Sequence, residues 1–186
     1  MAKNTKSGYA APTDLKPFSK KDPSILQVVI ETPKGSRNKY KFDPKLAAFK
    51  LSKVLPDGMD FPYDFGFVPS TQGEDGDPID VLLLMDESAF PGCVIESRLI
   101  GVIEGEQDQD GGKERNDRLV AVALENHRHS DLKDLATLNP TLVKELGQFF
   151  VNYHQQEGSK FKVLGVKGPK QAARLLDQAI KKGKSA

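Results

Sequence analysis

Three aspartates lie within the six residues Asp75-Gly76-Asp77-Pro78-Ile79-Asp80, which we call the acidic turn. Gly76 and Pro78 disfavour a helix, and the apolar run 81–85 that follows is typical of a buried strand. We therefore expect the carboxylates on a turn at the entrance to that strand. Three unpaired carboxylates at this spacing repel one another, and burial adds a desolvation cost that cations offset. The acidic turn thus predicts a site for hard divalent cations.

An EF-hand calcium loop is the first alternative, with Asp75 and Asp77 as its first and third ligands and Asp86 at its twelfth position. The sixth position of such a loop needs glycine for its sharp turn, and Asp80 stands there. The segment 81–84 is also strand-like where that loop needs polar ligands. A solvated turn that caps a strand is the second alternative, which three acids around one proline disfavour.

Length and charge narrow the class of protein. The chain has 186 residues, 38% of them apolar, which suffices for one domain with a sizeable core. The 27 lysines and arginines nearly balance the 26 acids, so no overall field would recruit nucleic acid or an anionic membrane. Cys93 is the single cysteine, and no apolar run approaches the length of a membrane span. We expect a soluble, cytoplasmic protein without nucleic-acid or membrane partners.

Alternating and β-branched runs predict the strands that must position the acidic turn. They fall at 25–31, 38–42, 48–55, 81–85, 118–124 and 161–166, with one or two more within 93–106. The aromatic, proline-punctuated segment 61–69 is expected as an irregular edge segment. The segments 86–91 and 108–116 are expected as loops, the second of them polar, glycine-rich and able to move.

Two helices are predicted after the strands. Apolar spacing favours a helix over 140–157, with Asn139 as its cap and Gly158 as its stop, and a closing helix over 169–182. Residues 1–24 read as an N-terminal arm, flexible or draped over the surface, and residues 25–186 as a single domain. Strands first and helices last predict an α+β fold.

The acidic turn resembles the signature of the soluble family I inorganic pyrophosphatases, Asp-x-Asp-Pro-(aliphatic)-Asp-(aliphatic), which residues 75–81 match throughout. The likeness extends in consistent order over about residues 25–166. Its further matching segments are Ile30-Glu31-Thr32-Pro33, Lys39, Lys53 before Phe61-Pro62, Gly66, Pro91-Gly92, Gly101-Val102, Arg118 to Val122, and Phe149-Phe150-x-x-Tyr153. The resemblance implies a five-stranded, OB-like closed β-barrel with flanking C-terminal helices. It also implies metal-dependent hydrolysis of pyrophosphate to two phosphates and a homo-oligomer.

The resemblance implies roles for individual residues. Asp75 and Asp80 would be metal ligands, with Asp80 shared between two ions, and Asp77 would orient or deprotonate the attacking water. Glu31 would support a metal ion through water. The groups implied to hold phosphate oxygens are Lys39, Lys53, Arg118 and Tyr153. The implied cofactor is Mg²⁺, with Mn²⁺ or Co²⁺ as alternatives, because oxygen-rich sites discriminate between these ions by geometry that spacing does not reveal.

Several positions depart from the family pattern. Lys41 stands where the family usually has an acid, Phe61 and Phe65 where tyrosines are common, and His154 where lysine is frequent. These changes remove phosphate donors, which predicts weaker substrate binding while the metal chemistry is kept.

A third acidic region is displaced in this sequence. The family places an Asp-Glu pair after the strand at 101–102 and an Asp two residues before position 118, where this chain has Gln107 with Asp108, and Asn116. Glu106 and Asp117 lie one position away, and a bulge would turn them inward. We expect Glu106 and Asp117 as metal ligands, with Asp108 in reserve. The alternative is that these are ordinary loop acids and one metal site is lost.

Two further function classes stay open. A small barrel with basic strand faces can track a nucleic-acid backbone, although the absence of tryptophan, the near-zero net charge and the acidic turn disfavour such a module. A non-catalytic paralogue would keep the fold and the metal site and use them to bind a partner.

Overall fold

The computed structural model describes residues 10–109 and 112–185. Its strands are β1 (Leu26–Thr32), β2 (Asn38–Asp43), β3 (Ala48–Val54), β4 (Asp64–Phe67), β5 (Asp80–Leu84), β6 (Val94–Gln109), β7 (Gly112–Arg115), β8 (Arg118–Ala123) and β9 (Lys160–Lys167). Its helices are α1 (Pro140–Gln156) and α2 (Pro169–Gly183), with short 3₁₀ turns η1 (Pro12–Asp14) and η2 (Leu135–Thr137). The predicted helices and most predicted strands are confirmed to within one to three residues at their ends.

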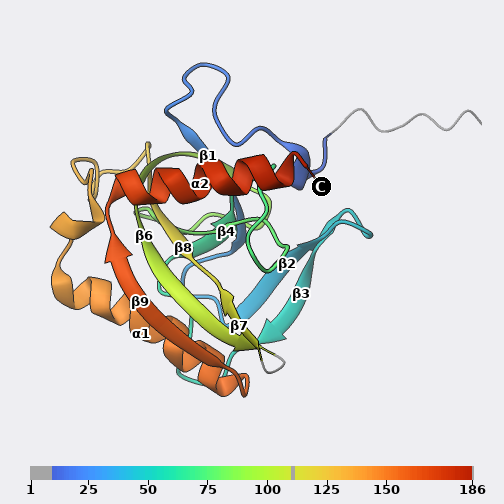
Figure 1. Ribbon diagram of the computed structural model, residues 1–186, viewed down its shortest axis with the longest axis vertical. Coiled ribbons are helices and arrows are strands. Elements are labelled where there is room, and N and C mark those ends of the chain that lie inside the picture. Colours follow the sequence, from blue (N-terminus) through green and yellow to red (C-terminus); the bar gives the residue numbers. More distant parts are fainter. Residues whose placement is uncertain (1–9, 110–111, 186) are drawn as a thin grey trace, which may run out of the picture.

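Five strands pair in a ring. The order runs β1-β4-β5-β8-β6, and β6 pairs again with β1. The β5–β8 pair is parallel, whereas the other pairs of the ring are antiparallel. Strand β6 continues beyond the ring, where β7 and β9 pair with it. Figure 1 shows α2 crossing one end of the curved sheet and α1 running along β9, which confirms the α+β class.

Each face of the ring strands has its own apolar cluster, because successive side chains of a strand point to opposite faces. Val81 and Leu83 of β5 pack in one cluster together with Ala172, Leu176 and Ala179 of α2. Leu82 and Leu84 pack in the other together with Leu146 and Phe150 of α1. The continuous apolar run of β5 follows from this two-sided burial, and it holds the carboxylate of Asp80 at the strand's first position.

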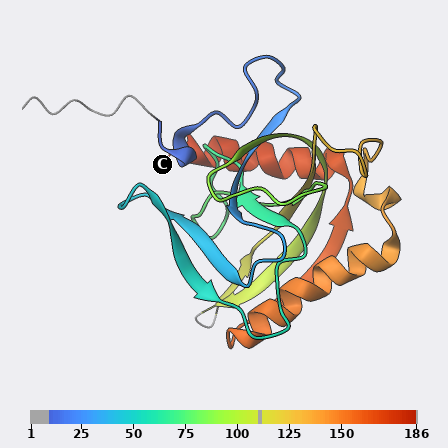
Figure 2. The same cartoon turned by 180° about the vertical axis from the view of Figure 1, so that it is seen from behind.

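The strands β2 and β3 form a separate two-stranded sheet that projects from the ring, as Figure 2 shows from behind. Phe42 of this hairpin packs with Val29 and Phe67 of the ring, and Phe49 joins them with its ring centroid 5.3 Å from that of Phe42. This contact fixes one face of the hairpin against the ring. On the hairpin's strand β2, Lys41 reaches the acidic turn and Lys39 reaches Tyr153 at the end of α1.

The expectation of an irregular edge segment over 61–69 is wrong. Within it, β4 is fully buried and pairs with β1 on one side and β5 on the other. The prolines at 62 and 69 lie outside the strand and therefore remove no ladder hydrogen bond. Gly66 allows the close approach of β4 to β1, since a Cβ there would collide with the Val29 carbonyl.

The expectation of a loop over 108–116 is also wrong in part. Asp108 and Gln109 belong to the end of β6, and residues 112–115 form β7, which pairs back along β6. Residues 110 and 111 lie outside the described part of the chain. A short polar strand of this kind lacks the apolar alternation that reveals a strand in a sequence.

The described part of the N-terminal arm, residues 10–24, lies along the ring. Phe18 forms a β-bridge with Leu26, the Ser19 hydroxyl donates to Glu96 at 2.7 Å, and Ser70 N donates to the Thr13 carbonyl at 2.8 Å. Residues 1–9, which the same prediction covers, fall outside the described residues. Among the described helices, none is long and apolar enough to cross a membrane.

Candidate active site

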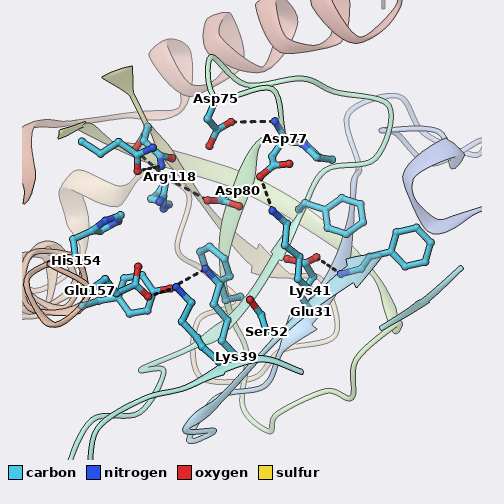
Figure 3. Close-up of a pocket in the computed structure, with 18 of the residues that line it drawn as sticks. Glu31, Lys39, Lys41, Ser52, Asp75, Asp77, Asp80, Arg118, His154 and Glu157 are labelled. Atoms are coloured by element: carbon cyan, nitrogen blue, oxygen red, sulfur yellow. Dashed lines mark hydrogen bonds and ion pairs between the residues drawn. The ribbon is translucent and has the colours of Figure 1, made fainter. Parts of the chain in front are cut away.

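A cavity of about 1100 Å³ lies between the ring, the β2–β3 hairpin and the end of α1. Carboxylates and cations line it together, as the side chains in Figure 3 show. The lining residues of the acidic turn are Asp75, Asp77 and Asp80, and the site residues predicted elsewhere that also line it are Glu31, Lys39, Lys53, Arg118 and Tyr153. The structure therefore brings eight of the ten predicted site residues to one cavity.

The acidic turn connects β4 to β5 and is held by its own backbone. Gly76 adopts φ of 84°, a left-handed conformation that glycine takes without strain. Asp77 N donates to Asp75 Oδ1 at 3.2 Å, and Gly73 N donates to the Asp77 carbonyl at 2.7 Å. Burial raises the pKa of Asp75, and the nearby charge of Asp80 raises it further. The turn thus concentrates negative charge that a cation would relieve.

Two protein cations already contact the acidic turn. Lys41 Nζ lies 2.6 Å from Asp77 Oδ2, and Arg118 Nη1 lies 3.2 Å from Asp80 Oδ2 (Figure 3). Burial acts to lower the pKa of Lys41, but its hydrogen bond with Asp77 and the surrounding carboxylates outweigh burial and raise it. Lys41 was expected only as a departure from the family pattern, and its contact with Asp77 was not predicted.

Glu31 is buried at the end of β1, where its Oε1 accepts a hydrogen bond from Phe42 N at 2.7 Å. Burial raises the pKa of Glu31 to about 7, and the charge of Asp80 adds to this effect. The hydrogen bond and the charges of Lys39 and Lys41 act in the opposite direction. Glu31 therefore changes its charge near neutral pH.

Lys39, Lys53 and Tyr153 form the side of the cavity that we call the basic wall. Lys39 Nζ donates to the Tyr153 hydroxyl at 3.0 Å, and Lys53 forms an ion pair with Glu157. Burial lowers the pKa of Lys39 and raises that of Tyr153, so the phenol stays neutral. The wall presents ammonium groups and a hydroxyl, which are donors suited to phosphate oxygens.

Arg118 is fixed more firmly than the lysines. Its side chain is 5% exposed, and its guanidinium lies over the rings of Phe150 and Phe161 at 5.1 and 5.6 Å. Nη1 donates to the Asn116 carbonyl at 3.0 Å, while Nε is buried without a hydrogen-bond partner among the described residues. Two aromatic rings packed against a guanidinium hold this planar cation in one orientation.

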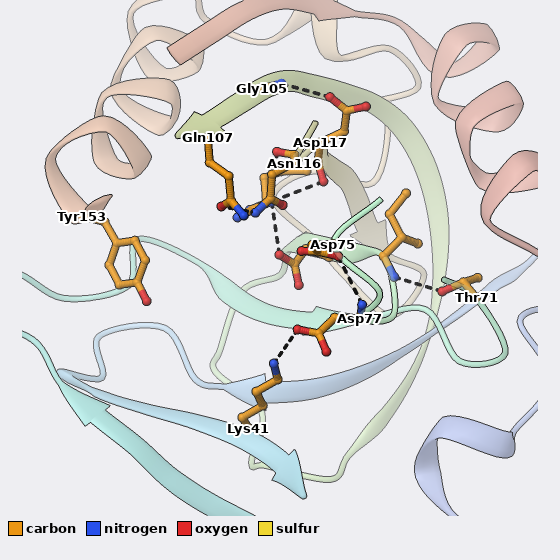
Figure 4. A network of polar contacts seen from close by, with 12 residues as sticks. Lys41, Thr71, Asp75, Asp77, Gly105, Gln107, Asn116, Asp117 and Tyr153 are labelled. Atoms are coloured by element: carbon orange, nitrogen blue, oxygen red, sulfur yellow. Dashed lines mark hydrogen bonds and ion pairs between the residues drawn. The ribbon is translucent and has the colours of Figure 1, made fainter. Parts of the chain in front are cut away.

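The third acidic region is arranged differently from the expectation. Gln107 and Asn116 are buried, line the cavity, and are joined by a hydrogen bond of 2.5 Å from Asn116 Nδ2 to Gln107 Oε1 (Figure 4). Strict counting from the family pattern lands on these two residues. The register of β6 with β7 is regular from Glu106 to Gln109, so no bulge turns a neighbouring acid inward there.

Glu106 and Asp117 do not line the large cavity. Glu106 pairs with Lys113 at 3.1 Å, and Asp117 accepts from Gly105 N at 2.9 Å and pairs with Arg115 at 2.8 Å. Asp117 borders a smaller cavity of about 510 Å³, which Asp75 and Asp80 also line. Alternation along β6 points Glu106 away from Gln107, and Asp117 lies between β7 and β8. Their role as metal ligands stays a prediction. Asp108, the reserve residue, lines the large cavity.

The acidic turn fits a hard divalent ion in part. Within the described residues, no group of three or more His, Cys, Asp or Glu side chains is arranged to hold a metal ion by itself. Mg²⁺ is often bound by one or two carboxylates, with water and substrate oxygens completing its shell. Asp75 and Asp80 offer such carboxylates, whereas Gln107 and Asn116 offer only neutral amides. The residues present therefore fit an ion that shares its shell with a phosphate ligand.

Sequence reasoning missed Glu157, which lines the cavity and pairs with Lys53. Glu157 follows Tyr153 by four residues, a spacing that places both on one side of a helix. That spacing was the available signal. His154 also lines the cavity, with its ring stacked on Phe161 at 5.0 Å between centroids.

The fold and the cavity together define a class: a small α+β protein whose carboxylate turn faces ammonium, guanidinium and phenol donors, as a metal-assisted site for a compact phosphate anion requires. Residues 28–184 match the family model described as inorganic pyrophosphatase. The chain belongs to the inorganic pyrophosphatase family, which confirms the resemblance of the sequence.

Individual relatives agree with this assignment. The chain is 40% identical over 159 residues to an inorganic pyrophosphatase of Nostoc sp. (strain PCC 7120), covering 86% of this chain and 92% of that protein. The crystal structure of inorganic pyrophosphatase from Thermus thermophilus superposes with a TM-score of 0.85 at 34% identity, covering 94% of this chain and 99% of that one. An inorganic pyrophosphatase from Helicobacter pylori gives a TM-score of 0.81 at 33% identity, over 88% of this chain and 95% of that one.

Proposed function

We propose that the protein hydrolyses inorganic pyrophosphate to two phosphates in a metal-dependent reaction. The observation that carries the proposal is the single cavity in which Asp75, Asp77 and Asp80 face Lys39 and Arg118, within a chain that belongs to the inorganic pyrophosphatase family. A doubly phosphorylated anion needs neutralisation of its oxygens, a nucleophilic water and a stabilised leaving group. The cavity offers residues for each task.

Asp75 and Asp80 would hold the metal ion. Mg²⁺ is the ion we propose, with Mn²⁺ or Co²⁺ as alternatives, and when bound it would polarise phosphate oxygens and acidify water. Glu31 would act through water, since its carboxylate is buried behind the acidic turn and bonded to the Phe42 backbone. Its raised pKa makes this support dependent on pH.

Asp77 would orient the attacking water and accept its proton. Its contact with Lys41 involves Oδ2, so the other carboxylate oxygen can accept a hydrogen bond from water. The ion pair with Lys41 would keep the Asp77 carboxylate in place beside the attacking water.

The basic wall and Arg118 would hold the phosphate groups. Lys53 is paired with Glu157 and Lys39 with the Tyr153 hydroxyl, so substrate binding exchanges these contacts for phosphate oxygens. Arg118 contacts Asp80 and would bridge the acidic turn and the anion. Two phenylalanines, Phe61 and Phe65, pack in the apolar cluster behind this wall and offer no hydroxyl to the anion.

Phosphate release from pyrophosphate tests the proposal. With Mg²⁺ we expect release that EDTA stops and that Asp77→Asn lowers by about 10² to 10⁴-fold, as loss of a general base does. Asp57→Asn is the matched control, because Asp57 is exposed and pairs with Arg37 outside the cavity. No release with Mg²⁺, Mn²⁺ or Co²⁺ would refute the proposal and favour a non-catalytic paralogue.

Four further predictions accompany this function. We propose that the ring β1-β4-β5-β8-β6 is the closed, OB-like barrel implied by the resemblance, that residues 25–186 fold as one domain, and that the chain forms a homo-oligomer in the cytoplasm. The pairing of β1 with both β4 and β6 supports closure. Light scattering of the purified protein measures the assembly state.

A further inference from the structure

Two of the three aspartates of the acidic turn are paired with cations of the protein itself. Lys41 lies 2.6 Å from Asp77 and Arg118 lies 3.2 Å from Asp80, from different strands and on different sides of the turn. The Arg118 guanidinium is buried over two aromatic rings, and Lys41 is a half-exposed side chain on β2. A divalent ion that used Asp77 would have to displace the ammonium of Lys41 or tolerate its charge nearby.

Another side of the cavity lining is formed by Gln107 and Asn116, whose amide groups carry no charge. Gln107 and Asn116 are both buried, and the hydrogen bond between them joins two amide groups (Figure 4). Amide oxygens are weaker and neutral ligands for hard cations, so affinity for such ions falls with each carboxylate that an amide replaces.

Two of the nearest acids in the sequence are engaged elsewhere, and the third, Asp108, is an exposed residue that lines the cavity next to Gln107. Asp117 is held by Arg115 and by Gly105 N, and Glu106 is held by Lys113. Recruiting either acid to the cavity would break these contacts, and for Glu106 it would also reverse the direction of a side chain of β6. An ion that enters the cavity on this side therefore meets the Gln107–Asn116 pair.

We propose that the substrate-free protein holds at most one divalent ion in this cavity, because Lys41 and the Gln107–Asn116 pair take the place of a second ion and its carboxylate ligands. This inference rests on the proposed function and specifies its metal complement. Any further ion then arrives with pyrophosphate, whose oxygens supply the ligands that the chain lacks. The positive charge of Lys41 stays beside Asp77 when little free metal ion is present.

Binding of Mn²⁺ without pyrophosphate tests the inference, read by the electron paramagnetic resonance signal of the free ion. We expect the wild-type protein to bind at most about one Mn²⁺ per chain at millimolar concentration, because one or two carboxylates give a single weak site. The double variant Gln107→Asp with Asn116→Asp should bind about one ion more than wild type, since it restores two charged oxygen ligands.

The variant Lys41→Glu keeps the test valid if the buried double variant does not fold. We expect it to bind Mn²⁺ at least about tenfold more tightly than wild type, because ligand charge sets affinity for hard ions. Lys45→Glu is the matched control: Lys45 lines the same cavity and undergoes the same change of charge, but it does not contact the acidic turn in the structure. We expect its Mn²⁺ binding to stay within about threefold of wild type, since a more distant charge is screened.

Two results would overturn the inference. One is binding of two or more Mn²⁺ ions by the substrate-free wild-type protein. The other is equal tightening by Lys41→Glu and Lys45→Glu, which would show a general charge effect and no special place for Lys41. Because the ions are counted without pyrophosphate, a failure to release phosphate would refute the proposed function and leave this count unchanged.

Discussion

Replacement of His154 by glutamine should remove one contribution that destabilises the fold as the pH falls. The His154 ring is buried, its Nδ1 lies 3.1 Å from the Ser159 hydroxyl, and it stacks on Phe161. Burial lowers the pKa of His154 from 6.5 to about 4, and the positive charge of Arg118 adds to this effect while Glu157 opposes it. The folded protein therefore keeps this imidazole neutral under conditions in which an unfolded chain protonates it.

The sign and size of the effect follow from linkage. Between pH 6.5 and pH 4 the unfolded chain binds a proton at His154 that the folded chain does not, so the free energy of unfolding falls as the pH falls. Each pKa unit corresponds to about 1.4 kcal/mol, which gives a loss of about 2 kcal/mol between pH 7 and pH 5. Glu31, whose pKa is raised to about 7, acts with the opposite sign over this range, because protonation favours its folded form.

Urea unfolding at pH 7 and pH 5 measures this loss. The wild-type protein should lose about 2 kcal/mol more than His154→Gln between the two pH values. Glu31 titrates in both proteins, so its contribution cancels in that difference. His127→Gln is the control, because the His127 side chain is fully exposed, and it should behave like wild type. Equal losses in wild type and His154→Gln would refute the assignment of His154 as a buried neutral imidazole.

Two further predictions concern the ring and the cavity. Gly66→Ala places a Cβ against the Val29 carbonyl and should lower the free energy of unfolding, measured in urea, by more than about 2 kcal/mol. Gly165→Ala is the control, because the nearest atom to its new Cβ would lie 3.6 Å away, and it should change this free energy by less than about 1 kcal/mol. Similar losses in both would contradict the close approach of β4 and β1. Arg118→Met leaves Asp80 without its partner and should cost about 3 kcal/mol, part of which Asp80→Asn should restore in the double variant. Strictly additive losses in that cycle would contradict an energetic link between the two side chains.

Much of the fold follows from patterns that the sequence displays directly. The β-branched and apolar runs located β1, β5, β8 and β9, and the spacing of apolar residues located both helices. Strand β4 was missed because the prolines around it and Gly66 within it indicate irregular backbone. Only the close passage of β1 shows that the glycine serves pairing between two buried strands.

Strand β7 was missed for a different reason. It is a short polar strand, and what identifies it as a strand is its pairing with β6 in the folded chain. Its pairing with the extended end of β6 is a contact between chain segments, and neither residue alternation nor turn composition encodes that contact.

The candidate site also contains residues that the sequence predicts and residues whose placement it does not predict. The three aspartates of the acidic turn could be predicted because their spacing is a local feature of the chain. The orientation of Glu106 could not be predicted, since one position of register decides which side of a strand a residue occupies. Asp117 lies between β7 and β8, where strand alternation gives no orientation. The contact between Lys41 and Asp77 joins segments 36 residues apart and required the hairpin to be placed.

The most direct test of the central claim is ³¹P nuclear magnetic resonance of pyrophosphate incubated with the protein and Mg²⁺ in water enriched in ¹⁸O. Hydrolysis by water predicts that the pyrophosphate signal is replaced by phosphate and that half of the phosphate carries one solvent oxygen. It also predicts that EDTA stops the conversion and that Asp77→Asn slows it. A pyrophosphate signal that persists with Mg²⁺, Mn²⁺ and Co²⁺ alike would contradict the account.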